Sequence, residues 1–331
     1  MDAAASLGPQ VSRLCAAIVL VLALCLLPAP ALAQERFALI VEGAAGDDRF
    51  AEQHAGWRDH LAEVLLKTYK VPDRYLVVLG SSADARDGIA TADAVRAAVA
   101  RLGSQMSEAD IALVVLIGHG TYDGSDAKFN LVGPDFSAAD WDALLGRLPG
   151  EVVFVNTASA SSPFLSALSG PRRVVITATA MPAQRFHTVF AEYFIDGLGE
   201  DEADIDRNGR RSVYEAFVYA SARVKQHYEQ RGQLATERAI LDDDGDGRGR
   251  EAGGEGEDGA RASVAYLDAD RAAIVTDPDM LRLMQRRDAL IGEIEELKKR
   301  RLMMQDQEYD ALLETLLIDL ALVSRDIRAR T

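Results

Sequence analysis

The chain has 331 residues, of which 48% are hydrophobic and 6% aromatic, enough for one sizeable hydrophobic core and an additional segment. Its formal net charge is −16 at pH 7, and its isoelectric point is near 4.8. A surface this acidic disfavours nucleic acid and anionic membranes as partners.

Residues 1–33 have the composition of a secretory signal peptide. A weakly basic start is followed by an apolar run, and an A-x-A pattern ends at Ala33. The apolar run is shorter than a membrane span, so we expect cleavage near Gln34, no membrane anchor afterwards, and a secreted or periplasmic protein. Both cysteines, Cys15 and Cys25, lie within this segment, so the mature chain is expected to have no thiol and no disulfide.

Residues 34–240 alternate strand-like apolar runs with helix-like segments. We expect strands at 37–41, 75–79, 114–117, 152–155 and 173–177, and helices at 51–69, at 91–102, from 137, and around 189–194. Ser137 is the expected N-cap of its helix because Asp140 follows three residues later. This alternation is typical of an α/β three-layer sandwich with a mainly parallel sheet.

Two of the expected strands end in residues that can carry chemistry. The strand at 114–117 ends in a Gly-His-Gly sequence centred on His119, and the strand at 152–155 ends in a serine-rich segment that contains Ser159 and Ser161. If these strands are neighbours, the histidine and the serines face each other at the carboxyl edge of the sheet, as a base and a nucleophile do. The alternatives are a structural histidine at a tight turn and a serine that caps the next helix. The remaining histidines are interpreted as surface or core residues of helical stretches: His54, His60, His187 and His227.

Residues 204–215 match the calcium-loop pattern D-x-[DN]-x-[DN]-G-x₅-E at every defined position. Such a loop needs short oxygen side chains at its first, third and fifth positions, a glycine for the turn, and a bidentate glutamate that closes the shell. The expected ligands of a structural calcium ion are Asp204, Asp206, Asn208, the carbonyl of Arg210, Ser212 and Glu215. The alternative is an acidic turn before the helix that we expect to continue to about residue 230.

The composition changes after residue 240. Residues 241–262 are rich in acidic residues and glycine and have no apolar period, which predicts a surface loop; the loop begins like a second calcium loop but has Gly253 where the closing glutamate belongs. Residues 278–331 predict an α-helical hairpin of the coiled-coil type, packed on itself or paired between subunits. Apolar residues at intervals of four and three define its second helix: Tyr309, Leu313, Leu316, Leu320, Val323 and Ile327.

The order of these motifs resembles the legumain (asparaginyl endopeptidase) family of cysteine peptidases, which share the caspase-type fold. In that family one strand ends in His-Gly, which carries the catalytic histidine, and the next ends in a segment such as Glu-Ala-Cys-Glu-Ser-Gly, which carries the nucleophile. The resemblance makes His119 the base, puts Ser159 at the cysteine position and puts Ser161 at the family's serine. It also implies that Arg49 and Ser161 belong to a substrate-binding pocket. It covers roughly residues 37–236.

The serine at the nucleophile position decides what function to expect. A thiol is intrinsically more nucleophilic than a hydroxyl, and a serine needs a hydrogen-bonded base that a third group orients. Asp123 and Asp126 follow His119 closely, but the sequence identifies neither as that group. We expect a secreted legumain-like peptidase homologue, non-hydrolytic or weakly hydrolytic, that binds a peptide or protein ligand at His119 and Ser159.

Three alternatives remain open at this stage. The first is an active endopeptidase that uses Ser159 and His119. The second is a protein that resembles the family in fold alone. The third is a calcium-stabilised assembly protein that associates with itself through the C-terminal hairpin.

Overall fold

The computed structural model describes residues 34–254, 258–268, 278–301 and 304–328. The predicted signal peptide lies outside these residues. Within the described ranges, no helix is long and apolar enough to cross a membrane.

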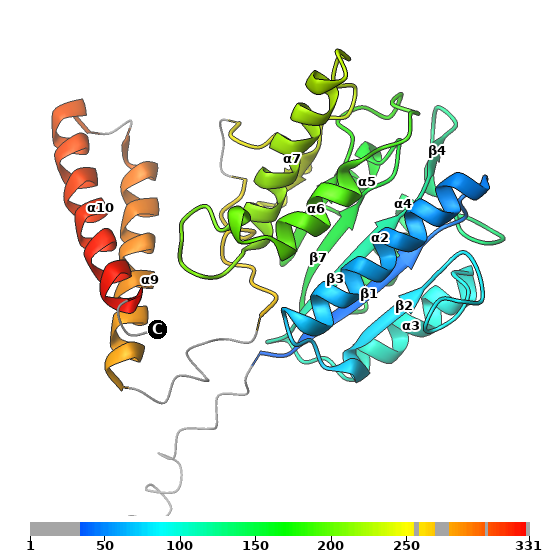
Figure 1. The fold of residues 1–331 in the computed structure, drawn as a ribbon, viewed down its shortest axis with the longest axis horizontal. Helices are drawn as coiled ribbons and strands as arrows, with labels where there is room; N and C mark the ends of the chain where they lie inside the picture. Colours follow the sequence, from blue (N-terminus) through cyan, green and yellow to red (C-terminus); the bar gives the residue numbers. More distant parts are fainter. Residues whose placement is uncertain (1–33, 255–257, 269–277, 302–303, 329–331) are drawn as a thin grey trace, which may run out of the picture. The chain divides into compact units, whose positions relative to one another are not determined.

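A six-stranded sheet with the strand order β2-β1-β3-β7-β8-β9 forms the centre of the α/β region (Figure 1). Its five parallel strands are β1 (Arg36–Glu42), β2 (Leu76–Leu79), β3 (Ile111–Ile117), β7 (Glu151–Asn156) and β8 (Arg173–Thr177). The strand β9 (Ile240–Asp242) pairs antiparallel with β8. The mainly parallel sheet is therefore confirmed, and β3 and β7 are direct neighbours. The edge strand β9 was not predicted, because three residues that run into an acidic segment give no strand period.

Helices cover both faces of this sheet. One face packs against α2 (Asp48–Lys67), α6 (Phe190–Gly199) and α7 (Val213–Gln230), and the other against α3 (Ala92–Gly103), α4 (Ala138–Leu145) and α5 (Ser162–Leu168). Successive strand residues point to opposite faces, so Val115 of β3 belongs to the first core and its neighbour Val114 to the second. Because the central strands are buried on both faces, they appear in the sequence as continuous apolar runs. Helices on both faces of the sheet confirm the three-layer α/β sandwich.

Local signals fix several helix boundaries. Ser137 and Asp140 form the predicted capping box at the start of α4. The helix α3 starts after Thr91, whose hydroxyl accepts a hydrogen bond from the amide of Ala94. Two short 3₁₀ helices, η1 (Asp73–Tyr75) and η2 (Asp201–Ala203), precede β2 and the 204–215 loop.

A small antiparallel sheet follows directly on β3. Its strands are β4 (Gly120–Tyr122), β5 (Ala127–Phe129) and β6 (Phe136–Ser137), in that order. The sequence did not predict this sheet, because strands of two or three residues carry no measurable period. Its consequence is that β4 begins immediately after His119.

The C-terminal α-helical hairpin consists of α9 (Pro278–Lys299) and α10 (Asp306–Arg328) (Figure 1). Leu290, Ile294 and Leu297 of α9 are buried, as is Tyr309 of α10. The predicted apolar row of α10 is otherwise half-buried. A second row on α10 is exposed and consists of Leu312, Leu317, Ile318 and Leu322.

Candidate functional site

The end of β3 is a tight turn that depends on two glycines. Gly118 has a φ of +149°, a conformation that side-chain-bearing residues rarely adopt. Gly120 lies against the end of β7, where a Cβ atom would be 2.3 Å from the carbonyl oxygen of Ser159. The two strand ends that the sequence predicts to be neighbours therefore meet, with His119 between the glycines.

Ser159 forms its hydrogen bonds with the backbone of Gly120. Its hydroxyl donates to the Gly120 carbonyl oxygen at 3.2 Å, and its oxygen accepts from the Gly120 amide at 3.4 Å. Among the hydrogen bonds of the described residues, none joins Ser159 to His119. The side chain is 4% exposed, and α5 begins later, with Ser161 in the N-cap position. Ser159 is therefore neither a helix cap nor paired with a base.

Ser161 is fully buried between the ends of β7 and β8. Its hydroxyl oxygen lies 3.1 Å from the hydroxyl oxygen of Thr179 and accepts a hydrogen bond from the Thr179 amide at 3.2 Å. The same threonine oxygen accepts from the amides of Ser161 and Ser162. These bonds connect the two strand ends and leave the Ser161 side chain out of contact with solvent.

The two acids that follow His119 in sequence lie in the β4–β5 turn. The carboxylate of Asp123 accepts hydrogen bonds from the amides of Ser125 and Asp126, both at 2.9 Å, and these bonds lower the pKa of Asp123 to about 2. The carbonyl of Asp126 in turn accepts from the amide of Asp123. Asp123 therefore stabilises its own turn. The group that His119 bonds is the backbone of Ala45, to which a ring N–H donates.

His119 belongs to a cluster of three histidines that sequence analysis did not predict. His54 lies on α2, and His187 lies in the segment before α6, which is not helical. Each histidine offers a ring nitrogen, and these nitrogens lie within 4.8 Å of one another. The ring centroids are 5.1 Å apart for His54 and His119, 5.7 Å for His54 and His187, and 5.9 Å for His119 and His187.

The imidazoles of this cluster are neutral near pH 7. Burial, together with electrostatic repulsion from His119, lowers the pKa of His54 to about 3 and that of His187 to about 4. Burial also lowers the pKa of His119, although its bond to the Ala45 backbone opposes that shift. Each ring therefore keeps one unprotonated nitrogen that can accept a proton or bind a metal.

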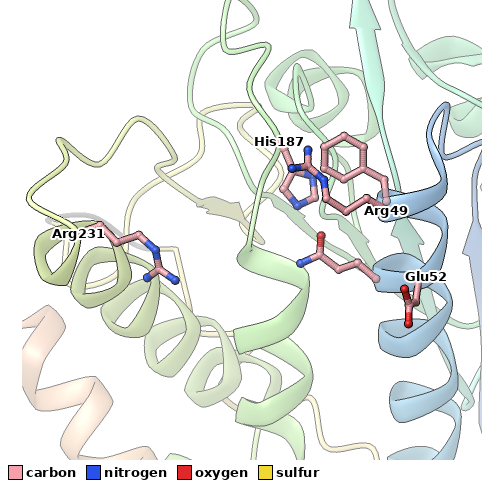
Figure 2. Close-up of a pocket in the computed structure, with 6 residues that line it drawn as sticks. Arg49, Glu52, His187 and Arg231 are labelled. Atoms are coloured by element: carbon pink, nitrogen blue, oxygen red, sulfur yellow. The ribbon is translucent and has the colours of Figure 1, made fainter.

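A cavity of about 680 Å³ borders the histidine cluster (Figure 2). Its wall consists of Arg49, Phe50, Glu52, Gln53, His187 and Arg231. Phe50 lines the cavity and also contacts the histidine cluster. The centroid of its ring is 4.5 Å from that of His187 and 4.9 Å from that of His119. Figure 2 shows His187 beside Arg49, with Arg231 on the opposite side. Arg49, which the family resemblance implies for substrate binding, thus lies next to the histidines.

The predicted calcium loop brings its acidic residues together. Asp204, Asp206 and Glu215 each offer a carboxylate oxygen, and these oxygens lie within 4.8 Å of one another. Burial and the charge of Glu215 raise the pKa of Asp206 to about 6. Glu215 also forms a capping box with Ser212 at the start of α7. The loop therefore has the exit helix and the converging carboxylates that a calcium loop requires.

Comparisons with known proteins give structural likeness only. No protein-family model and no curated protein matches the chain. Among solved structures, protein GSU0716 of Geobacter sulfurreducens is 13% identical, with 63% of this chain and 92% of that chain covered and a TM-score of 0.40. The structure described as pro-sf-caspase-1 is 9% identical, with 63% and 91% covered and a TM-score of 0.41. At these scores, function has to be argued from the site itself.

Proposed function

We propose that this chain is a caspase-fold, legumain-like peptidase homologue that binds peptides and does not hydrolyse them. The main support for this proposal is that the hydroxyl of Ser159 donates its hydrogen bond to the Gly120 carbonyl and not to an imidazole. A serine nucleophile needs a base within hydrogen-bond reach to remove its proton, and a carbonyl oxygen cannot serve as that base. Secretion belongs to the same proposal and is supported by the composition of residues 1–33.

The charges of the cavity beside His187 favour an acidic ligand. Arg49 and Arg231 contribute two positive charges to its wall and Glu52 one negative charge, in a chain whose net charge is −16. A guanidinium binds a carboxylate through charge-assisted hydrogen bonds, often in pairs. The ring of Phe50 adds an apolar surface. These features suit a peptide that presents a carboxylate next to an apolar side chain.

Equilibrium binding of labelled peptides tests this proposal. Acidic peptides should bind wild-type protein more tightly than the same peptides with Gln and Asn in place of Glu and Asp. Arg49→Gln should weaken binding of the acidic peptides about 10- to 150-fold, since one charge-assisted hydrogen bond contributes roughly 1.5–3 kcal/mol. Arg96→Gln is the matched control, because Arg96 is half-exposed on α3 across the sheet and pairs with Asp93. Equal affinity for both peptide sets, or equal losses in both variants, would exclude this ligand class.

Self-association through α10 is a second candidate function. The exposed apolar row of this helix favours it, with Leu317 48% and Ile318 53% exposed. Pairing with a second copy of the chain would bury these side chains. We expect light scattering to give a dimer for the wild type and a monomer for Leu317→Glu, while Ile89→Glu, at an exposed apolar residue of the α/β region, remains dimeric. A monomeric wild type would rule this candidate out.

A further inference from the structure

We propose that His54, His119 and His187 bind a divalent transition-metal ion of the zinc type, with one coordination position open to the adjacent cavity. This inference goes beyond the proposed peptide binding and does not depend on it. It rests on the arrangement of the three rings, on their hydrogen bonding and on their surroundings.

The spacing of the rings is that of a three-histidine metal site. Imidazoles that bind one zinc ion at about 2.0–2.1 Å in tetrahedral directions have ring centroids about 5 Å apart. The three centroid separations here are 5.1, 5.7 and 5.9 Å. The ligating nitrogens, which lie within 4.8 Å of one another, must approach to about 3.3 Å.

The hydrogen bonding of the rings leaves their nitrogens available. Both ring nitrogens of His54 and both of His187 are buried and have no hydrogen-bond partner among the described residues, and His54 is only 1% exposed. An unpaired buried polar group costs about 1–3 kcal/mol, and a metal ion would remove that cost at one nitrogen of each ring. His119 donates one ring N–H to the Ala45 backbone. Metal-binding histidines characteristically donate their second nitrogen to such a carbonyl, which orients the ring.

The ligand atoms and the adjacent cavity indicate which kind of metal ion the site would bind. Imidazole nitrogens bind zinc, copper and nickel, whereas calcium and magnesium require oxygen ligands. Three protein ligands and one open position characterise zinc sites that bind water or an exogenous ligand. The open side here is the cavity, because His187 lines its wall together with Arg49 and Phe50, and the Phe50 ring contacts both of these residues. The positive charge of Arg49 suits an anion, such as hydroxide or a carboxylate, as the fourth ligand.

Titration of the untagged chain from residue 34 with zinc tests the proposal. Excess calcium is present so that oxygen sites are filled. We expect one zinc ion per chain, a rise in the melting temperature, and, with cobalt(II), the strong visible absorption of a tetrahedral complex. His54→Ala and His187→Ala should each weaken zinc binding by more than the roughly 10–100-fold that loss of a hydrogen-bonding partner of a ligand costs. His60→Ala, on the exposed side of α2, is the matched control and should bind zinc as the wild type does.

X-ray absorption on the zinc-loaded wild type keeps the test decisive if a histidine variant does not fold. Three imidazoles in the first coordination shell are expected. Fewer than three imidazoles, no zinc uptake by the folded wild type, or equal affinity in the His54→Ala and His60→Ala proteins would overturn the proposal. Zinc uptake is measured without peptide and peptide binding is measured in EDTA, so failure of the metal site and failure of the proposed peptide function give different results.

Discussion

The hydroxyl oxygen of Ser159 lies 3.2 Å from the carbonyl oxygen of Gly120, and this contact joins the end of β7 to the start of β4. The same two residues approach so closely that a side chain at position 120 has no room. In the legumain family, which this sequence resembles, the nucleophile lies at this strand end. In this chain the same strand end stabilises the turn after His119.

Gly120→Ala should destabilise the protein. The added Cβ atom would lie 2.3 Å from the Ser159 carbonyl oxygen, so the backbone must shift, at a cost of about 1–3 kcal/mol. Gly56→Ala is the opposite control, because an added Cβ within α2 meets no atom within 4 Å. It should stabilise the helix by about 0.5–1 kcal/mol. Urea unfolding of both variants measures the difference, and a Gly120→Ala protein as stable as the wild type would contradict the close approach.

Arg58→Met should cost about 3–5 kcal/mol of stability. Arg58 of α2 forms a 2.6 Å ion pair with Glu42 at the end of β1, and both side chains are buried. Removing the arginine leaves the carboxylate buried without its counter-charge. Arg96→Met is the control, since the half-exposed pair of Arg96 with Asp93 contributes little. Equal stability losses in chemical denaturation would show that the Arg58 pair is not buried as described.

Glu237 should make stability depend on pH. Its carboxylate accepts hydrogen bonds from the amides of Val189 and Phe190 at the start of α6, a helix without a capping side chain of its own. Burial raises the pKa of Glu237 from 4.5 to about 7, although these amides oppose the shift. The folded state therefore binds the proton more tightly than the unfolded state. The contribution of Glu237 to the free energy of unfolding should fall as the pH rises from about 4.5 to about 7, by roughly 3 kcal/mol in total.

Comparison with Glu237→Gln isolates this contribution from those of other groups. The variant keeps the size of the side chain and cannot ionise, so its unfolding free energy should lack this decrease between pH 4.5 and 7. If the free energies of unfolding of the two proteins changed with pH in the same way, the pKa of Glu237 would not be raised.

Calcium should raise the melting temperature through the 204–215 loop, which we propose as a calcium site. Binding to the folded state alone stabilises it by about 2.7 kcal/mol at a free concentration 100 times the dissociation constant. Glu215→Gln should abolish the rise, with each protein compared with itself in EDTA because Glu215 also caps α7. Asp246→Asn, in the separate cluster of Asp242, Asp244 and Asp246, should preserve it. A wild type that does not respond to calcium would contradict the assignment.

The sequence predicted the layers of the fold well because the central strands are buried on both faces. The apolar runs that end before Gly118 and Asn156 are long enough to be recognised, and the Ser137–Asp140 capping box marks a helix start directly. The short strands β4, β5, β6 and β9 were missed, since two or three residues cannot show a period. Their positions depend on tertiary pairing instead.

The site was predicted only in part. The sequence indicated that His119 and Ser159 lie at neighbouring strand ends, but it could not indicate that the Ser159 hydroxyl turns toward Gly120 or that Ser161 bonds Thr179. His54 and His187 were missed because they come from a helix and a loop far from His119 in the chain. Only the packing of α2 and of the segment before α6 brings their rings together. The substrate-binding roles of Arg49 and Ser161 stay predictions.

The most direct test of the central claim is mass spectrometry of an acidic peptide library after incubation with the mature protein, with the Ser159→Ala variant beside it. We predict that both proteins retain intact peptides and that neither produces cleavage products. Cleavage by the wild type that is lost in Ser159→Ala would contradict this account, because it would establish Ser159 as a nucleophile.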